Sequence, residues 1–290
     1  MSDATLPASP QPDRISLWRI AAKNRSVFWG GLILAVIAIL AIFGPFLAGN
    51  PFELNAMSRL KPPGEFGLFG TDQLGRDVFA RVINGARISL TVGLAVAVIA
   101  VAIGLVLGLV AGYVRWADGL IMRAMDGLMA IPAILLAIAM ISLSGATLTT
   151  VIAAIVIPEV PVVVRLVRSV VLSVREEAYV EAAISAGTRT GAIMTRHVLP
   201  NTIAPLIVQA TYICASAMLT ESILGFLGAG IPPEIPSWGN IMSEGRTFFQ
   251  LTPWIIFFPG AALAVTVLAV NVVGDGLRDT LDPRIARAMR

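Results

Sequence analysis

Long apolar stretches without charged side chains limit what this chain can fold into. Residues 27–48, 88–114, 198–220 and 247–274 carry no charge, and residues 127–164 carry only Glu159. A helix that crosses the hydrocarbon core of a bilayer needs about 20 such residues. The stretch 127–164 is long enough for two helices, with a turn predicted at 142–145. The sequence therefore predicts six transmembrane helices.

Composition supports a membrane fold and argues against a water-soluble one. The chain is 57% hydrophobic and only 13% charged over 290 residues, whereas soluble domains are usually about 25% charged. A soluble fold of this length could not bury that much apolar surface. The net charge of +3 does not indicate nucleic-acid binding, because the basic residues flank apolar stretches and form no continuous patch. We predict an all-α, polytopic membrane protein.

The distribution of Lys and Arg predicts its orientation. With the N-terminus in the cytoplasm, 15 of the 21 basic residues fall on the cytoplasmic side, as the positive-inside rule requires. We therefore expect a multi-pass protein of the cell (inner or plasma) membrane with both termini cytoplasmic. The expected parts are a tail at 1–26, a transmembrane domain at 27–275 with outer segments 49–87 and 222–250, and a tail at 276–290. Residues 2–13 are polar and proline-rich, which is typical of disorder.

A cytoplasmic segment at 172–200 has the pattern of a helical hairpin. Ser173 with Glu176 predicts a capping box at the start of the first helix. Gly187 is suited to the left-handed residue that ends it. A second short helix is expected to begin near Thr190 and to stop before Pro200.

One face of the first predicted helix is suited to docking. Glu177 and Glu181 are four residues apart on one side, while Ala182 and Ala183 present small side chains beside them. Small residues allow close approach of a partner, and a charged edge can fix its orientation through charge-assisted hydrogen bonds. The alternative is a solvated helical hairpin with no partner.

The same segment resembles a known family. Its residues Glu181, Ala182, Ala183, Gly187, Leu199 and Pro200 match, in order and spacing, the EAA loop of ABC-importer permeases. In that family the loop holds a coupling helix that inserts into a cleft of the cytoplasmic ATPase. The resemblance implies that Glu181 and the turn at Gly187 make this contact. His197 stands where the family often has isoleucine, as is frequent in peptide-type permeases.

Further motifs resemble the C-type subunit of the dipeptide and oligopeptide branch. They are GTDQLGRD at 70–77, GFLG at 225–228, PSWG at 236–239 and GDGLRDTLDPR at 274–284. The resemblance implies a permease subunit that forms half of a translocation path for short peptides. It implies as partners a second permease subunit, cytoplasmic ATP-binding subunits and an extracytoplasmic substrate-binding protein. Nickel importers share much of the pattern, so nickel or another small solute is the alternative cargo.

Two carboxylates are candidates for the translocation path. Glu159 lies within a predicted span, flanked by Pro158 and Pro161. Because a charge at this depth is costly, it should face the bundle interior or water. The alternative for Glu159 is a structural carboxylate bound to another helix. Glu221 is expected at the outer end of the fifth span and is the second candidate.

Three further predictions concern local contacts. The segment 49–87 is expected to pack on the outer face rather than to contact cargo directly. The outer segment that follows Glu221 is expected to lie in the interface or re-enter the membrane, where it contacts a binding protein or is anchored by Trp238. Arg123 and Asp126 are expected to form a local ion pair.

The sequence argues against an enzyme. The two lysines, Lys23 and Lys61, do not follow the glycine pattern of a phosphate-binding loop. No HExxH or CxxC motif occurs, so neither a metal site nor catalytic residues are expected. No cofactor is expected on this chain, and ATP would be used by partner subunits. The competing classes are an ion-coupled secondary transporter, which usually shows internal repeats, and an intramembrane hydrolase.

Overall fold

The apolar stretches form long helices in the computed structural model, which describes residues 24–281. Five helices are long and apolar enough to cross a membrane: α2 (Arg25–Leu47), α3 (Val78–Tyr113), α6 (Leu148–Arg175), α9 (Leu199–Phe226) and α11 (Trp254–Leu281). The pair α4 (Arg115–Met129) and α5 (Ala133–Ser144), bent by 86°, makes a sixth span if it is counted as one. Within the described residues the only β-type pairing is the isolated bridge between Thr71 and Asp77. The predicted all-α membrane fold is confirmed.

The helix boundaries differ from the predicted ones where charged residues have partners in space. Helix α3 begins ten residues earlier than expected, because Asp77 caps it by accepting a hydrogen bond from the Phe79 N–H at 2.8 Å. Helix α4 begins at Arg115 rather than near 127. Its Asp118 accepts two hydrogen bonds from Arg168 of α6, at 2.5 and 2.7 Å. The predicted turn at 142–145 is confirmed, since α5 ends at Ser144 and Gly145 has φ of +84°.

The predicted local pair between Arg123 and Asp126 is wrong. Asp126 binds Arg165 of α6 at 2.7 Å instead. Both α4 carboxylates are therefore bound by arginines of α6, so α4 is fixed by contacts between helices rather than within one.

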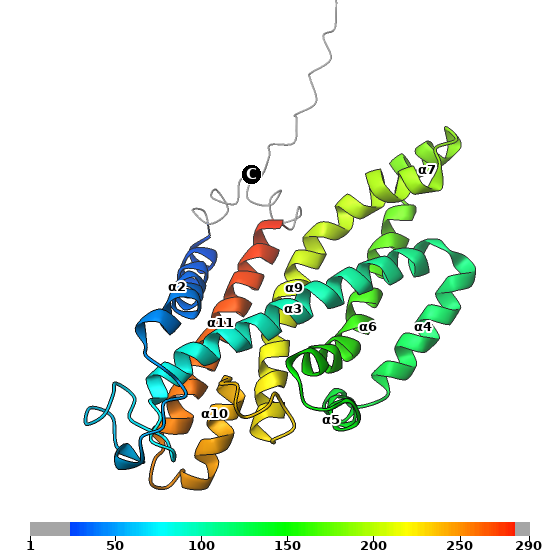
Figure 1. Cartoon of the computed structure of the whole chain (residues 1–290). Coiled ribbons are helices and arrows are strands. Elements are labelled where there is room, and N and C mark those ends of the chain that lie inside the picture. The colour runs from blue at the N-terminus through cyan, green and yellow to red at the C-terminus, as the bar shows by residue number, and fades with distance from the viewer. Residues whose placement is uncertain (1–23, 282–290) are drawn as a thin grey trace, which may run out of the picture.

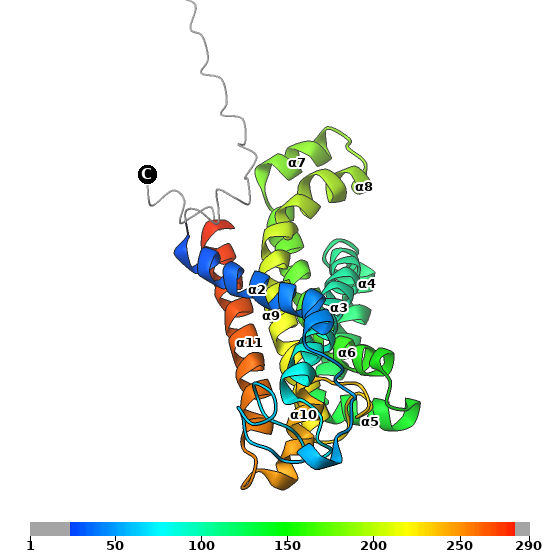
Figure 2. The same cartoon turned by 60° about the vertical axis from the view of Figure 1, so that its left-hand side comes forward.

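The helices run between two ends of an elongated bundle (Figures 1 and 2). One end carries α7 (Ala178–Ser185), α8 (Thr190–Ile193) and the π-helical turn η2 (Met194–Val198); we call it the hairpin end. The opposite end carries η1 (Ala56–Ser58), α10 (Trp238–Gly245) and η3 (Arg246–Phe248); we call it the α10 end. The described ends of α2 and α11 lie toward the hairpin end (Figure 1). Of the tails predicted at 1–26 and 276–290, residues 1–23 and 282–290 lie outside the described residues.

The core of the bundle is a seam between α3 and α6, which pack on each other more extensively than any other two helices. Gly104, Gly108 and Gly112 of α3 face Val163, Val167 and Val171 of α6, one valine to each glycine. A Cβ atom at Gly108 would lie only 2.6 Å from the Cβ of Val167. Small residues at four-residue spacing allow this close packing of membrane helices.

Apolar side chains also cover the outside of the bundle. Phe46 and Leu47 at the end of α2 are 84% and 86% exposed, and Leu143 of α5 is 88% exposed. Exposed apolar surface of this extent is the pattern expected for helices that face lipid or a partner subunit.

Candidate functional site

The hairpin predicted from the sequence is present and ends its first helix with a Schellman motif. Gly187 has φ of +76°. Its N–H donates to the Ile184 carbonyl at 2.9 Å, and the Thr188 N–H donates to the Ala183 carbonyl at 3.0 Å. These two bonds satisfy the last free carbonyls of α7. The left-handed conformation explains why glycine is required at this turn.

Two details of the predicted hairpin are wrong. Ser173 does not cap its first helix, because α6 continues through Ser173 to Arg175, and α7 begins after Glu177. The second helix does not stop before Pro200. It continues through the π-helical turn η2 into α9, whose second residue is Pro200. The π-type hydrogen bond from the Leu199 N–H to the Met194 carbonyl marks the break in the regular ladder at which a residue without an N–H is tolerated. The hairpin is therefore continuous with α9 and separated from α6 by only two residues.

Most of the predicted coupling residues face outward from this hairpin. Glu177, Glu181, Ala182, Gly187 and Pro200 are exposed, while Ala183 and Leu199 are partly buried. Val180 and Ile193, by contrast, are 0% and 1% exposed and belong to the hydrophobic core, so each arm has a buried side chain. The Asn201 amide links the two arms by hydrogen bonds, donating to the Tyr179 hydroxyl at 3.3 Å and to the His197 carbonyl at 2.6 Å. The hairpin is thus a folded unit with an exposed acidic and small-residue face.

A polar pocket of about 420 Å³ lies at the base of the hairpin. Glu181 lines it together with Arg115, Asp118, Arg175 and Glu176. Arg175 donates to the Gly112 carbonyl at 3.1 Å and lies 5.4 Å from the centre of the Tyr113 ring. The pocket therefore connects the hairpin to the ends of α3, α4 and α6.

Glu159 lies between α6 and α9. The Ser216 hydroxyl of α9 donates to Glu159 Oε1 at 2.9 Å, and the side chain is half-buried. Pro158 and Pro161 both lie inside α6 without interrupting it. The hydrogen bond matches the predicted structural alternative, and Glu159 is not fully enclosed by the bundle.

Glu221 is fully buried and lines no surface in this conformation. It is 0% exposed, and the Ser89 hydroxyl of α3 donates to its Oε2 at 3.1 Å. The neighbouring Ser222 hydroxyl lies 3.4 Å from the same oxygen. Glu221 thus joins α9 to α3 near the α10 end.

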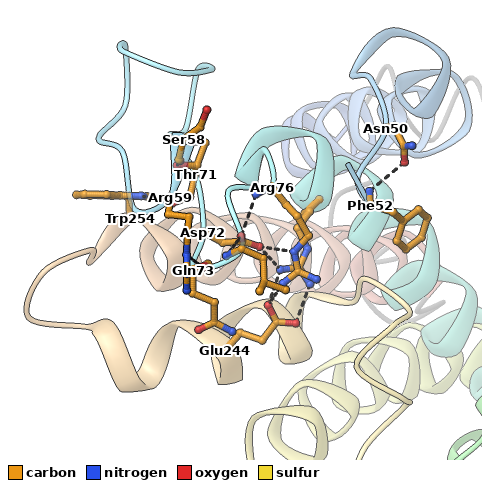
Figure 3. A network of polar contacts seen from close by, with 12 residues as sticks. Asn50, Phe52, Ser58, Arg59, Thr71, Asp72, Gln73, Arg76, Glu244 and Trp254 are labelled. Carbon is orange, nitrogen blue, oxygen red and sulfur yellow. Dashed lines mark hydrogen bonds and ion pairs between the residues drawn. The ribbon is translucent and has the colours of Figure 1, made fainter. Parts of the chain in front are cut away.

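A cluster of four charged side chains, which we call the ion cluster, lies at the α10 end (Figure 3). Asp72 Oδ2 accepts hydrogen bonds from Arg76 at 2.6 Å and from Arg81 at 2.8 Å. Glu244 of α10 accepts two from Arg81, at 2.6 and 2.9 Å, and one from Arg76. The Arg81 and Asp72 side chains are 2% and 1% exposed. The cluster ties the segment before α3, the start of α3 and α10 to one another.

The segments at the α10 end pack on the bundle, which corrects the role predicted for Trp238. This residue is 1% exposed and donates its indole N–H to the Val82 carbonyl at 3.0 Å. It is therefore a core residue between α10 and α3, and not an anchor in the membrane interface. Trp254 of α11 similarly donates to the Thr71 carbonyl at 3.3 Å.

The ion cluster was not among the site residues predicted from the sequence. Asp72, Arg76 and Arg81 are close in the sequence, and opposite charges at this short spacing could have indicated part of the cluster. Glu244 lies 163 residues beyond Arg81, and no local pattern links the two. Helix α10 is only eight residues long, so periodicity does not reveal which of its side chains faces α3.

Two protein-family models match this chain. Residues 100–287 match the family described as binding-protein-dependent transport system inner membrane component. Residues 16–63 match the N-terminal TM domain of oligopeptide transport permease C. The hairpin, its pocket and Glu159 all lie within the first of these matches.

Curated relatives cover almost the whole chain. A probable peptide ABC transporter permease protein, y4tQ of Sinorhizobium fredii, is 54% identical over 279 residues, which are 96% of each chain. The dipeptide transport system permease protein DppC of Alkalihalophilus pseudofirmus is 44% identical over 96% of this chain and 95% of its own.

A solved structure supports the fold. A chain of the MetNI methionine ABC transporter in an inward-facing conformation matches with a TM-score of 0.51 at 21% identity, covering 70% of this chain and 94% of its own. The family match and the curated relatives show that the chain belongs to the binding-protein-dependent transport system inner membrane components, the membrane-spanning permease subunits of ABC importers.

Proposed function

We propose that this permease subunit forms half of a translocation path for short peptides and couples it to cytoplasmic ATPases through the hairpin. The names of its relatives, which are peptide and dipeptide permeases, support peptide as cargo over nickel or another small solute. The partners would be a second permease subunit, ATP-binding subunits that use the ATP, and an extracytoplasmic substrate-binding protein. Both termini would then be cytoplasmic, on the side of the hairpin.

The observation that carries the coupling role is the way the hairpin is joined to the bundle. Helix α7 follows α6 after two residues, and α8 continues through η2 into α9. A force on the exposed face around Glu181 therefore acts on α6 and α9 together. The seam between α3 and α6 passes the motion to α3, which carries the ion cluster at its far end. Packed helices transmit such displacement because they shift as bodies rather than deform.

ATP hydrolysis by the particle that co-purifies with this chain tests the coupling role. Peptide and binding protein should stimulate hydrolysis, and Glu181→Ala should reduce the stimulated rate about tenfold, which corresponds to ~1.4 kcal/mol of lost docking energy. Gly187→Val should do the same, because a β-branched residue disfavours φ of +76°.

Thr195→Ala is the matched control for this assay. Thr195 is exposed on the same hairpin and donates only to its own helix, to the Gly191 carbonyl at 2.9 Å. Its stimulated rate should equal that of the wild type. A particle without any ATPase activity, isolated from membranes where the chain is intact, would instead favour an ion-coupled transporter.

We place Glu159 on the path, with its exposed part toward cargo or water. Glu159→Gln should lower transport about tenfold while the complex assembles normally, because the amide still accepts the Ser216 hydrogen bond but carries no charge. Peptide uptake into reconstituted vesicles measures this. Ser216→Ala, which removes the hydrogen bond and keeps the carboxylate, should retain most of the uptake. Wild-type uptake by Glu159→Gln would leave Glu159 with only a structural role.

A further inference from the structure

A second pocket lies at the α10 end, between the end of α2 and the start of α3. Its volume is about 220 Å³. The side chains that matter for its chemistry are Asn50, Glu53, Asn55, Ser58, Phe66 and Asp77. Several come from the loop between α2 and α3, which Figure 3 shows around Asn50, Ser58 and Thr71. None of these residues belongs to the hairpin, the ion cluster or the path carboxylates.

The pocket is lined by two acids that form no ion pair within residues 24–281. Glu53 and Asp77 are the only charged residues among those that line it. In the described part of the chain neither takes part in an ion pair. The nearby Asp72, by contrast, is bound by both Arg76 and Arg81. Burial raises the pKa of the Asp77 carboxyl above its ordinary value, because it disfavours the charged form. A cation bound beside Asp77 would act in the opposite direction and favour the charged form.

A buried hydroxyl in the same pocket lacks a partner. Ser58 is 3% exposed and lines the pocket, and its Oγ has no hydrogen-bond partner. The adjacent Thr71 hydroxyl does not supply one, because it donates to the Ser58 carbonyl. Buried polar atoms are nearly always hydrogen-bonded. Ser58 Oγ is therefore a hydrogen-bonding group at this pocket whose partner the described part of the protein does not supply.

The remaining lining suits an organic cation better than a metal ion. No group of three or more His, Cys, Asp or Glu residues suited to a metal occurs among residues 24–281. Phe66 is 46% exposed and lines the pocket, and an aromatic face attracts alkylammonium ions. Asn50 and Asn55 each accept one backbone N–H, from Phe52 and Met57, so each amide oxygen keeps a second lone pair.

We propose that this pocket binds a primary alkylammonium group, with Glu53 and Asp77 offsetting its charge and Ser58 Oγ accepting a hydrogen bond from one of its N–H groups. The group belongs to a free amine or to the amino terminus of a peptide, which share this chemistry. The site is separate from the coupling hairpin, and its occupancy does not require ATP, a binding protein or transport.

Binding of n-butylammonium to the assembled transporter, purified through this chain, tests the proposal. We expect saturable binding that n-butanol does not compete for, since the alcohol has the same chain without the charge. The double variant Glu53→Gln/Asp77→Asn should weaken this binding about tenfold. Asn keeps the N-cap of α3 because its side-chain oxygen still accepts the Phe79 N–H.

Glu65→Gln is the matched control. Glu65 is an exposed carboxylate of the same loop, lies outside the pocket, and is 3.9 Å from Lys61. Its variant should bind as the wild type does. Absence of saturable binding, equal binding by the double variant, or equal loss in Glu65→Gln would each overturn the proposal.

The source of the ammonium is resolved by two peptides. If dialanine amide competes with n-butylammonium and its N-acetyl form does not, the site accepts a peptide amino terminus. If neither competes while n-butylammonium still binds through Glu53 and Asp77, the site is one for free amines. Both outcomes support an ammonium site, and competition by the N-acetyl form as strong as that by the free peptide would contradict it.

Discussion

Helix α3 is held by opposite kinds of contact along its length. Toward the hairpin end, Gly104, Gly108 and Gly112 meet three valines of α6, and no polar side chain is among the atoms nearest to them. At the α10 end, Arg81 of the same helix is held by two carboxylates, from Asp72 and Glu244. The seam depends on shape and the ion cluster depends on charge.

The two contacts therefore respond to different changes. A seam without side chains on one helix has no room to adapt, because interiors are packed to crystal-like density. An ion cluster with two acids and two arginines tolerates changes in shape but not the removal of one charge, which leaves a buried charge without its partner. The comparison suggests that α3 and α6 move as one body, while the α10 end is fixed by contacts that are stable only as a complete set.

The largest expected effect is that of bulk in the seam. Gly108→Leu should cost more than about 3 kcal/mol and prevent the chain from accumulating, because its side chain has no space beside Val167. The folded fraction can be measured in membranes through labelling of Cys214, the single cysteine, which is buried at 6% exposure.

Gly31→Leu provides the control for bulk alone. A Cβ atom at Gly31 of α2 meets nothing within 4 Å, so this variant should protect Cys214 as the wild type does. If Gly108→Leu also protected Cys214 fully, α3 and α6 would have to separate easily, and the view of the seam as rigid would be wrong.

The next effect is that of removing one charge from the ion cluster. Glu244→Gln should destabilise the α10 end by about 2 kcal/mol, less than the loss of a fully enclosed pair. The Glu244 side chain is 14% exposed, and Asp72 still binds both arginines. The temperature at which Cys214 becomes reactive should fall accordingly. Glu234→Gln, at an exposed carboxylate of the same outer segment, should leave that temperature unchanged.

A double variant separates charge from shape at this end. Arg81→Met with Glu244→Leu removes a positive and a negative charge together and leaves Asp72 with Arg76. It should be less destabilised than Glu244→Gln, because apolar pairs often replace buried ion pairs without loss. If the double variant were less stable than Glu244→Gln, the packing of α10 on α3 would require the directed contacts of the charged side chains, which apolar side chains do not replace.

The sequence predicted the elements that depend on local pattern. Uncharged stretches located the spans, and the glycine at 187 located the turn, because both signals are contained in one short segment. It was wrong where a distant partner decides the outcome. Asp126 binds Arg165 of α6 rather than Arg123 of its own helix. Helix α6 extends through Ser173 to Arg175, so Ser173 lies inside it and does not cap the next helix.

The candidate site divides in the same way. The exposed hairpin face was predicted because Glu181, Ala182 and the turn at Gly187 lie within one short segment, although Glu177 stands at the N-cap of α7 and not inside the helix. The pairing of Arg81 with Glu244 joins residues 163 positions apart, and only the packing of α10 on α3 brings them together. The residues around Trp238 indicated an interface aromatic, but its burial against α3 depends on that same packing of α10 on α3.

The smallest expected effect is that of an exposed ion pair close to the ion cluster. Lys61 and Glu65 are 3.9 Å apart, and their side chains are 41% and 58% exposed. Lys61→Met should therefore change stability by less than about 0.5 kcal/mol, since solvent screens such pairs. Reactivity of Cys214 during heating, compared with Glu244→Gln in the same membranes, measures the difference. A loss of stability as large as that in Glu244→Gln would mean that the buried charges of the ion cluster contribute no more than this exposed pair. The ion cluster would then not be what fixes α3 at the α10 end.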